Sequence, residues 1–188
     1  MMRALWLLGL ALLSLQAQAS EDVLAKGKQD GDIPAWAIAV STPAGWTRDC
    51  CIYAKAIGVD ALLYQGEWTG KPQRVMVLNV TPRKLPTLEA EVQADRKHFL
   101  QTDPAAKVSG FPVPHASMSC QATVYEGSDR IDDVVVFCEP NEASGLRLSW
   151  SMSFDDGTPG QRALLDDFMR VVVATHYRRA EASDTHGG

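Results

Sequence analysis

The four cysteines are the residues with the most distinctive chemistry in this 188-residue sequence. Cys50 and Cys51 are adjacent, whereas Cys120 and Cys138 lie far along the chain. Such residues serve proteins as redox centres, metal ligands or disulfide cross-links. A redox centre normally shows the spacing Cys-X-X-Cys, and a zinc site shows paired ligands at short spacing. The sequence has neither spacing, so we expect all four cysteines to be disulfide candidates and not catalytic.

The histidines give little support for a catalytic or metal site. Zinc bound by Cys50 and Cys51 would need the distant His98 or His115. His98 falls in a predicted helix and is expected to face solvent, and His176 is expected near the C-terminal end of the last helix, where the helix dipole favours positive charge. There is no nucleophile elbow, His-Glu-X-X-His motif or phosphate-binding glycine loop. We therefore predict no catalytic residue, metal ligand or cofactor.

The local charges around Cys50 do not indicate an activated thiolate. Arg48 would lower the pKa of a nearby thiol, and Asp49 would raise it. The two effects oppose each other, which again favours a structural or incidental role for the adjacent cysteines.

Alternating apolar residues predict the strands that must position these side chains. In the last predicted strand, residues 146–154, the apolar residues alternate with polar ones, so only one face is buried. Leu148, Trp150 and Met152 are expected beneath the last helix, whereas Arg147 and the three serines of this strand are expected to point outward. Two of the strands form a hairpin around a turn at residues 66–72. The predicted strands span residues 35–40, 59–68, 73–82, 119–126, 131–139 and 146–154.

Two helices are expected. Thr87 is a plausible N-cap for the first, which has Glu89 and Glu91 in its first turn. The last helix begins with a capping box at residues 158–161 and Pro159 at its first position. Its apolar stripe consists of Leu164, Leu165, Phe168, Val171 and Val172, and Arg178 and Arg179 are expected at its C-terminal end.

A three-residue loop at residues 128–130 would place Cys120 opposite Cys138 in a hairpin. Facing cysteines in an oxidising compartment are expected to bond. Cys50 and Cys51 would then form a vicinal disulfide, stay reduced or bridge to another molecule. Two disulfides that join this early segment to the hairpin are the alternative, because connectivity does not follow from sequence.

The N-terminus predicts export. Residues 1–19 combine Arg3, an apolar run too short to span a bilayer, and small residues at Ala17 and Ala19, as in a secretory signal peptide. We expect cleavage after Ala19, no membrane insertion, and a periplasmic or secreted location.

One domain is expected after cleavage. Residues 20–32 are predicted to be a mobile N-terminal segment, residues 33–178 a single domain, and residues 179–188 a disordered tail. The sequence has 18 Lys and Arg against 23 Asp and Glu, a formal net charge of −5. This balance argues against nucleic acid as a partner.

The element order predicts an α+β fold, a mainly antiparallel sheet with helices packed on it. The Pro-Ala-Gly-Trp turn at residues 43–46, the central helix from Thr87, the late strands and the closing helix together resemble the PsbP-like family. The resemblance implies an α/β/α sandwich, shared with a nuclear import factor that binds the GTPase Ran. It also implies a binding or assembly protein more than an enzyme.

Our leading hypothesis is an exported, non-enzymatic binding or accessory protein whose partner is another protein. One alternative is a periplasmic immunity or inhibitor protein against a toxin or hydrolase, which would suit a small, acidic, disulfide-containing chain. The other is a small thiol- or histidine-dependent hydrolase, which would need His115 or His98 beside Cys50, Cys51 or a carboxylate.

Overall fold

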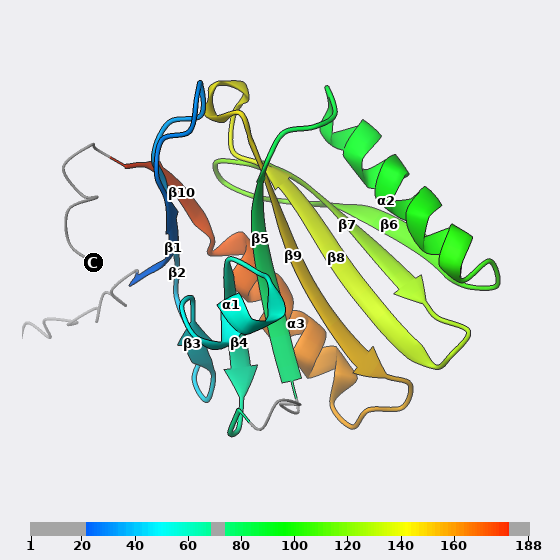
Figure 1. Cartoon of the computed structure of the whole chain (residues 1–188). Helices are drawn as coiled ribbons and strands as arrows, with labels where there is room; N and C mark the ends of the chain where they lie inside the picture. The colour runs from blue at the N-terminus through cyan, green and yellow to red at the C-terminus, as the bar shows by residue number, and fades with distance from the viewer. Residues whose placement is uncertain (1–21, 69–73, 181–188) are drawn as a thin grey trace, which may run out of the picture.

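The computed structural model describes residues 22–68 and 74–180, and its larger β-sheet has seven strands in this part of the chain (Figure 1). They are β3 (Thr47–Asp49), β4 (Ala61–Gln65), β5 (Arg74–Pro82), β6 (Lys107–Val113), β7 (Ser119–Glu126), β8 (Ile131–Glu139) and β9 (Leu146–Asp155). Their order in the sheet is β3-β4-β5-β9-β8-β7-β6, and all neighbours are antiparallel. The prediction of a mainly antiparallel sheet is confirmed.

A second, smaller sheet joins the two ends of the described chain. It consists of β1 (Asp22–Gly27), β2 (Trp36–Val40) and β10 (His176–Arg179), with β2 in the centre. Both outer strands are antiparallel to β2, and the register of β1 shifts at Leu24, which has no partner residue in β2. β1 is therefore an edge strand with a bulge.

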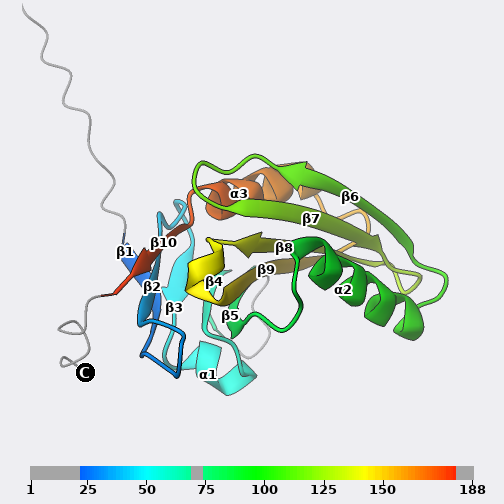
Figure 2. The ribbon, with the colours of Figure 1, turned by 90° about the horizontal axis from the view of Figure 1, so that it is seen from above.

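Helices lie on both faces of the larger sheet (Figure 2). α2 (Leu88–Thr102) contacts β7 and β8 on one face, α3 (Gln161–Val173) contacts β9 on the other, and the short α1 (Tyr53–Ile57) lies beside β4. A single 3-10 turn, η1 (Glu142–Ser144), precedes β9. The α/β/α arrangement agrees with the predicted sandwich.

The main apolar core lies between β9 and α3. Leu148, Trp150 and Met152 of β9 are buried there with Phe168 and Val172 of α3. Successive residues of a strand point to opposite faces, so this even-numbered set faces α3, as predicted.

The opposite face of β9 differs from the prediction. Arg147 was expected to point outward with the serines, but its side chain is only 2% exposed. The physical reason is that α2 covers this part of the sheet, with Glu91 of α2 lying 4.0 Å from the Arg147 Nε atom.

The β7–β8 hairpin has the predicted register. Cys120 faces Cys138, and Ala122 faces Val136. The Gly127 N–H donates to the Ile131 carbonyl at 3.0 Å, which closes the loop. The register is confirmed.

The two main helices begin differently. Thr87 caps α2 as predicted, because its side chain accepts a hydrogen bond from the Ala90 N–H at 3.1 Å. The predicted capping box of α3 is wrong. Thr158 instead bonds back to the Asp155 carbonyl in a turn, and the helix begins after Gly160, whose positive φ of 76° suits glycine.

Several elements escaped the sequence analysis. Residues 20–32 were expected to be mobile, yet residues 22–27 form β1. Neither β3, α1 nor β6 was predicted. His176, Arg178 and Arg179 were assigned to the end of the last helix, but they belong to β10, because the helix ends at Val173 and the chain then returns to pair with β2.

The predicted signal peptide and its cleavage site lie outside the described residues, as do residues 181–188 of the predicted disordered tail. The first residue of that tail, Arg179, belongs to β10. In residues 22–68 and 74–180, no helix is both long and apolar enough to cross a membrane.

Candidate functional site

All four cysteines are oxidised. Cys120 and Cys138 form a disulfide across the β7–β8 hairpin, where both residues are buried. Cys50 and Cys51 form a vicinal disulfide between β3 and α1, with Cys51 exposed and Cys50 half-buried. The structure therefore has one cross-link within the hairpin and one within the early segment, and no disulfide joins the two.

Asp49 holds the loop that carries the vicinal disulfide. Its carboxylate accepts hydrogen bonds from the backbone N–H groups of Cys51 at 3.2 Å, Ile52 at 3.2 Å and Ala54 at 2.7 Å. Arg48 points elsewhere and forms an ion pair with Asp22 of β1 at 2.9 Å. The charges next to the cysteines thus shape the loop and tie β3 to β1.

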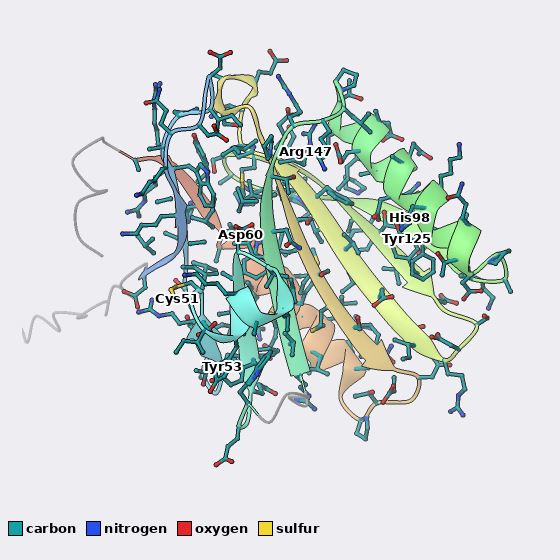
Figure 3. The ribbon with its side chains drawn as sticks, in the orientation of Figure 1. Cys51, Tyr53, Asp60, His98, Tyr125 and Arg147 are labelled. Atoms are coloured by element: carbon teal, nitrogen blue, oxygen red, sulfur yellow. A yellow bond between two sulfur atoms is a disulfide. The ribbon has the colours of Figure 1, made fainter. Side chains whose placement is uncertain are left out.

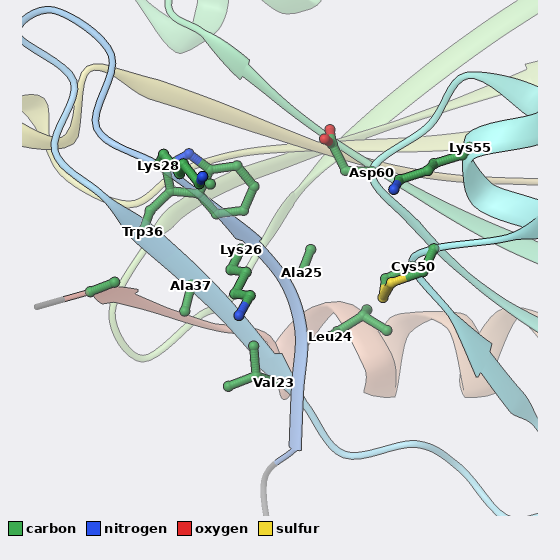
Figure 4. A pocket seen from close by; sticks show the side chains of 13 residues that line it. Val23, Leu24, Ala25, Lys26, Lys28, Trp36, Ala37, Cys50, Lys55 and Asp60 are labelled. Atoms are coloured by element: carbon green, nitrogen blue, oxygen red, sulfur yellow. A yellow bond between two sulfur atoms is a disulfide. The ribbon is translucent and has the colours of Figure 1, made fainter. Parts of the chain in front are cut away.

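A groove of about 650 Å³ separates this loop from β1 (Figure 4). We call it the β1 groove. One wall is formed by residues 23–28, and the other by Cys50, Cys51 and Lys55, with Asp60 at the same side. The vicinal disulfide is therefore part of a concave surface, which is where proteins place most ligand sites.

The floor of the β1 groove is apolar and closely packed. Leu24 is 3% exposed and Trp36 is 7% exposed, and both line the groove. The Trp36 ring lies over Gly27, its partner residue in the adjacent strand, so closely that a Cβ added at Gly27 would lie 2.3 Å from the ring. Glycine at this position is what allows the ring to cover the backbone.

The charge of the β1 groove is opposite to that of the chain. Lys26, Lys28 and Lys55 line it, and Asp60 is the acidic residue among the lining side chains. The Asp60 carboxylate already accepts a hydrogen bond from the Val80 N–H at 2.6 Å. The three lysines form no ion pair within the described residues. A basic groove on a protein with a net charge of −5 favours anionic groups.

Exposed apolar side chains lie next to the groove. Ile52, which follows the vicinal disulfide in the sequence, is 70% exposed, and Val23 of β1, which lines the groove, is 50% exposed. An apolar area around a groove is typical of a surface that meets another protein.

The histidines do not gather around the cysteines. His98 is on the exposed side of α2 (Figure 3). Both ring nitrogens of His115 are occupied, since Nδ1 accepts from the backbone N–H groups of Ser117 and Met118, each at 3.1 Å, and Nε2 lies 3.0 Å from the Thr175 carbonyl. This pattern assigns the proton to Nε2. Burial lowers the pKa of His115, and its bonds fix the loop against the end of α3.

A buried ionic cluster attaches α2 to the sheet. The Arg147 guanidinium lies 3.0 Å from Glu139, which also binds Arg83 at 3.0 Å, and Glu91 approaches from α2. Arg147 was not expected to be buried, and periodicity gave no signal for it because the face covered by α2 is largely polar. The cluster is a structural device that holds the helix, since a buried charge is stable only when it is paired.

Tyr125 forms a second attachment of α2. Its hydroxyl donates to the Asp95 carboxylate, and its ring stacks on Phe99 with the centroids 4.1 Å apart. Burial, followed by the hydrogen bond to Asp95, raises the pKa of Tyr125 well above its usual value. The residue is therefore neutral at physiological pH and acts as a donor.

No group of three or more potential metal ligands occurs among the residues that the structure describes. The β1 groove offers an apolar floor, a disulfide wall and lysine ammonium groups, which suit apolar and anionic groups of a ligand.

Comparison with known proteins supports the fold. No protein-family model matches the sequence, and no curated protein matches it. Among solved structures, the chain is similar to cyanobacterial PsbP from Synechocystis sp. PCC 6803, with a TM-score of 0.50 and 12% identity over 87% of this chain and 99% of that one. The predicted resemblance to PsbP is confirmed at the level of the fold, and it carries no residue of that protein's function to this chain.

Proposed function

We propose that this chain is an exported, non-enzymatic binding or accessory protein that holds a partner in the β1 groove. The observation that carries the proposal is the groove itself, which combines an apolar floor, exposed Val23 and Ile52, and three lysines that have no ion pair among residues 22–68 and 74–180. Apolar contacts supply affinity in protein interfaces, and charges around them supply specificity.

The state of the nucleophile candidates supports a non-enzymatic role. A thiol enzyme needs a thiolate, and Cys50 and Cys51 are joined in a disulfide. A histidine general base needs a free ring nitrogen, and both nitrogens of His115 are engaged with the backbone. These observations weigh against the hydrolase alternative.

Two disulfides support export. Disulfides persist in the periplasm and outside the cell and are rare in the cytosol. The predicted signal peptide at residues 1–19 is consistent with this location. Export is tested by intact-mass measurement after osmotic shock, which should find a chain that begins at Ser20 in the released fraction. A retained N-terminus or an attached lipid would refute it.

Binding is tested by photo-crosslinking in the native cell. Lys28, which follows the last residue of β1, is replaced by p-benzoylphenylalanine, and Lys97 on the exposed side of α2 is replaced in the same way as a control. We expect the Lys28 position to capture one partner that excess unmodified protein competes away, and the Lys97 position to capture none. Identical adducts from both positions, or no saturable adduct from Lys28, would contradict the proposal.

A further inference from the structure

We infer that the β1 groove binds an extended acidic peptide segment of a partner protein, and that this segment adds as a strand to the free edge of β1. The inference rests on the proposed binding function and specifies the chemistry of the ligand.

The groove runs along the edge of β1. In the order β1-β2-β10, one side of β1 has no neighbouring strand within the described residues. Successive side chains of a strand point to opposite faces, so a cavity on one face would contact every second residue. All six residues from Val23 to Lys28 line the groove, so the groove runs past the backbone edge of β1 (Figure 4). Ala37 of β2 and Ala180 line the part of it that reaches the neighbouring strands. An unpaired edge offers N–H and C=O groups to an incoming strand.

Charge selects an acidic ligand. Lys26 belongs to β1 and Lys28 follows its last residue, and Lys55 projects from α1 on the facing wall (Figure 4). A segment lying between these walls would have ammonium groups on both sides. Carboxylates of the segment would satisfy the lysines, whereas a basic segment would be repelled.

The same features disfavour a second copy of this chain as the occupant. Charged residues, lysine above all, and bulges are the devices by which edge strands avoid pairing with their own kind. β1 has both, in Lys26 and in the bulge at Leu24. A second β1 strand would also bring its own Lys26 and Lys28 into a groove that three lysines already line, while its Asp22 is held in the ion pair with Arg48.

The apolar parts of the groove would bind alternate side chains of the segment. Leu24 and Trp36 form the floor, and the vicinal disulfide forms the facing wall. In strand addition the backbone hydrogen bonds supply affinity, and pockets for alternate side chains supply specificity. The expected ligand therefore alternates acidic and apolar residues.

A defined peptide library tests the inference on the full mature chain. The probes are acetylated, amidated octapeptides that alternate Glu with Val, Ile, Leu, Tyr or Phe. A matched library has Lys in place of Glu, and a third set carries N-methylated backbone amides on one edge. Binding is followed by amide chemical shifts and hydrogen exchange of residues 23–28. We expect binding by acidic peptides, protection of β1 amides, and at least a tenfold loss upon N-methylation, because each net hydrogen bond contributes severalfold to affinity.

Charge reversal gives the second arm. The double variant Lys26→Glu/Lys55→Glu should weaken binding of acidic peptides by about tenfold and should bind the Lys library instead. The variant Lys97→Glu, which lies on α2 outside the groove, should leave binding unchanged. Circular dichroism and the β1 amide spectrum check that each variant is folded.

Several outcomes would overturn the inference. They are no binding by the acidic library up to about 1 mM, equal binding of N-methylated peptides, shifts outside the groove, or concentration-dependent dimers that protect β1. If the Lys28 position captures a partner but the acidic peptides neither bind nor protect the β1 amides, the proposed function is retained and strand addition is rejected. Failure of that capture would instead remove the proposed function.

Discussion

The two disulfides should contribute very differently to stability, and the difference can be worked out from the loops that they close. A disulfide stabilises mainly by reducing the entropy of the unfolded chain, in proportion to the logarithm of the loop length. The Cys120–Cys138 bridge spans a sequence separation of 18, for which loop entropy predicts about 3 kcal/mol. In a domain of this size that corresponds to a melting temperature higher by about 6–12 °C.

The vicinal bridge closes no comparable loop. Cys50 and Cys51 are already joined by a peptide bond, and their bridge restricts only a few torsion angles of one short turn. We therefore expect it to contribute less than about 1 kcal/mol to the free energy of unfolding.

Each bridge can be measured without interference from the other. Cys50→Ser/Cys51→Ser retains the hairpin bridge, and Cys120→Ala/Cys138→Ala retains the vicinal one. The free energy of unfolding of each variant is determined by urea denaturation in its oxidised and in its reduced form. The difference between the two forms isolates the disulfide, because the substituted residues are the same in both. An equal or larger contribution from the vicinal bridge would refute the loop-entropy argument.

Three further predictions concern packing and protonation. Phe168→Ala should lower the free energy of unfolding by about 3–5 kcal/mol, because the ring is fully buried between α3 and β9. A negligible change in the free energy of unfolding, measured by urea denaturation, would mean that α3 does not pack on β9 through this residue. Burial and nearby His176 lower the pKa of His115. As the pH falls, the unfolded state therefore binds a proton before the folded state does, and the free energy of unfolding should decrease below about pH 6.5. The His115→Gln variant should lose this part of the pH dependence, and an unchanged slope of the free energy of unfolding against pH would contradict the lowered pKa of His115. Gly27→Ala should displace the Trp36 ring and change its indole NMR signal. Gly157→Ala, in the turn between β9 and α3 and with no atom within 4 Å of an added Cβ, should leave that signal unchanged. Equal indole signals from the two variants would show that Trp36 does not cover Gly27.

The predictable parts of the fold are those fixed by local sequence. The β7–β8 register followed from a short loop and a pair of facing cysteines, which leave little freedom in the pairing. Thr87 marks the start of α2 because a side-chain oxygen at that position satisfies a backbone N–H that the helix leaves open. The core beneath α3 followed from strict alternation in β9.

The candidate site could not be predicted because long-range pairing creates it. β1 lacks the alternation of buried and exposed residues by which strands are recognised, because its two buried side chains, Leu24 and Ala25, are adjacent at the bulge. Its strand conformation depends on β2, which β10 also joins from the far end of the chain. The adjacent Cys50 and Cys51 drew attention to one wall of the groove, but the groove itself forms only when the small sheet lies beside the larger one. Arg147 was missed for a related reason, since its burial depends on α2.

A vicinal disulfide that adds little to global stability can still shape a binding surface. The ring of Cys50 and Cys51 replaces two freely rotating thiols by one compact apolar wall, and the three N–H bonds to Asp49 hold that wall from the side of the loop. A preformed wall loses little conformational entropy when a ligand arrives, which increases affinity without any new contact. The facing wall is a strand held by β2, and the Arg48–Asp22 ion pair connects the two walls beside the groove. The adjacent cysteines are therefore best explained by the surface that they form, since neither thiolate chemistry nor cross-linking of distant segments accounts for them.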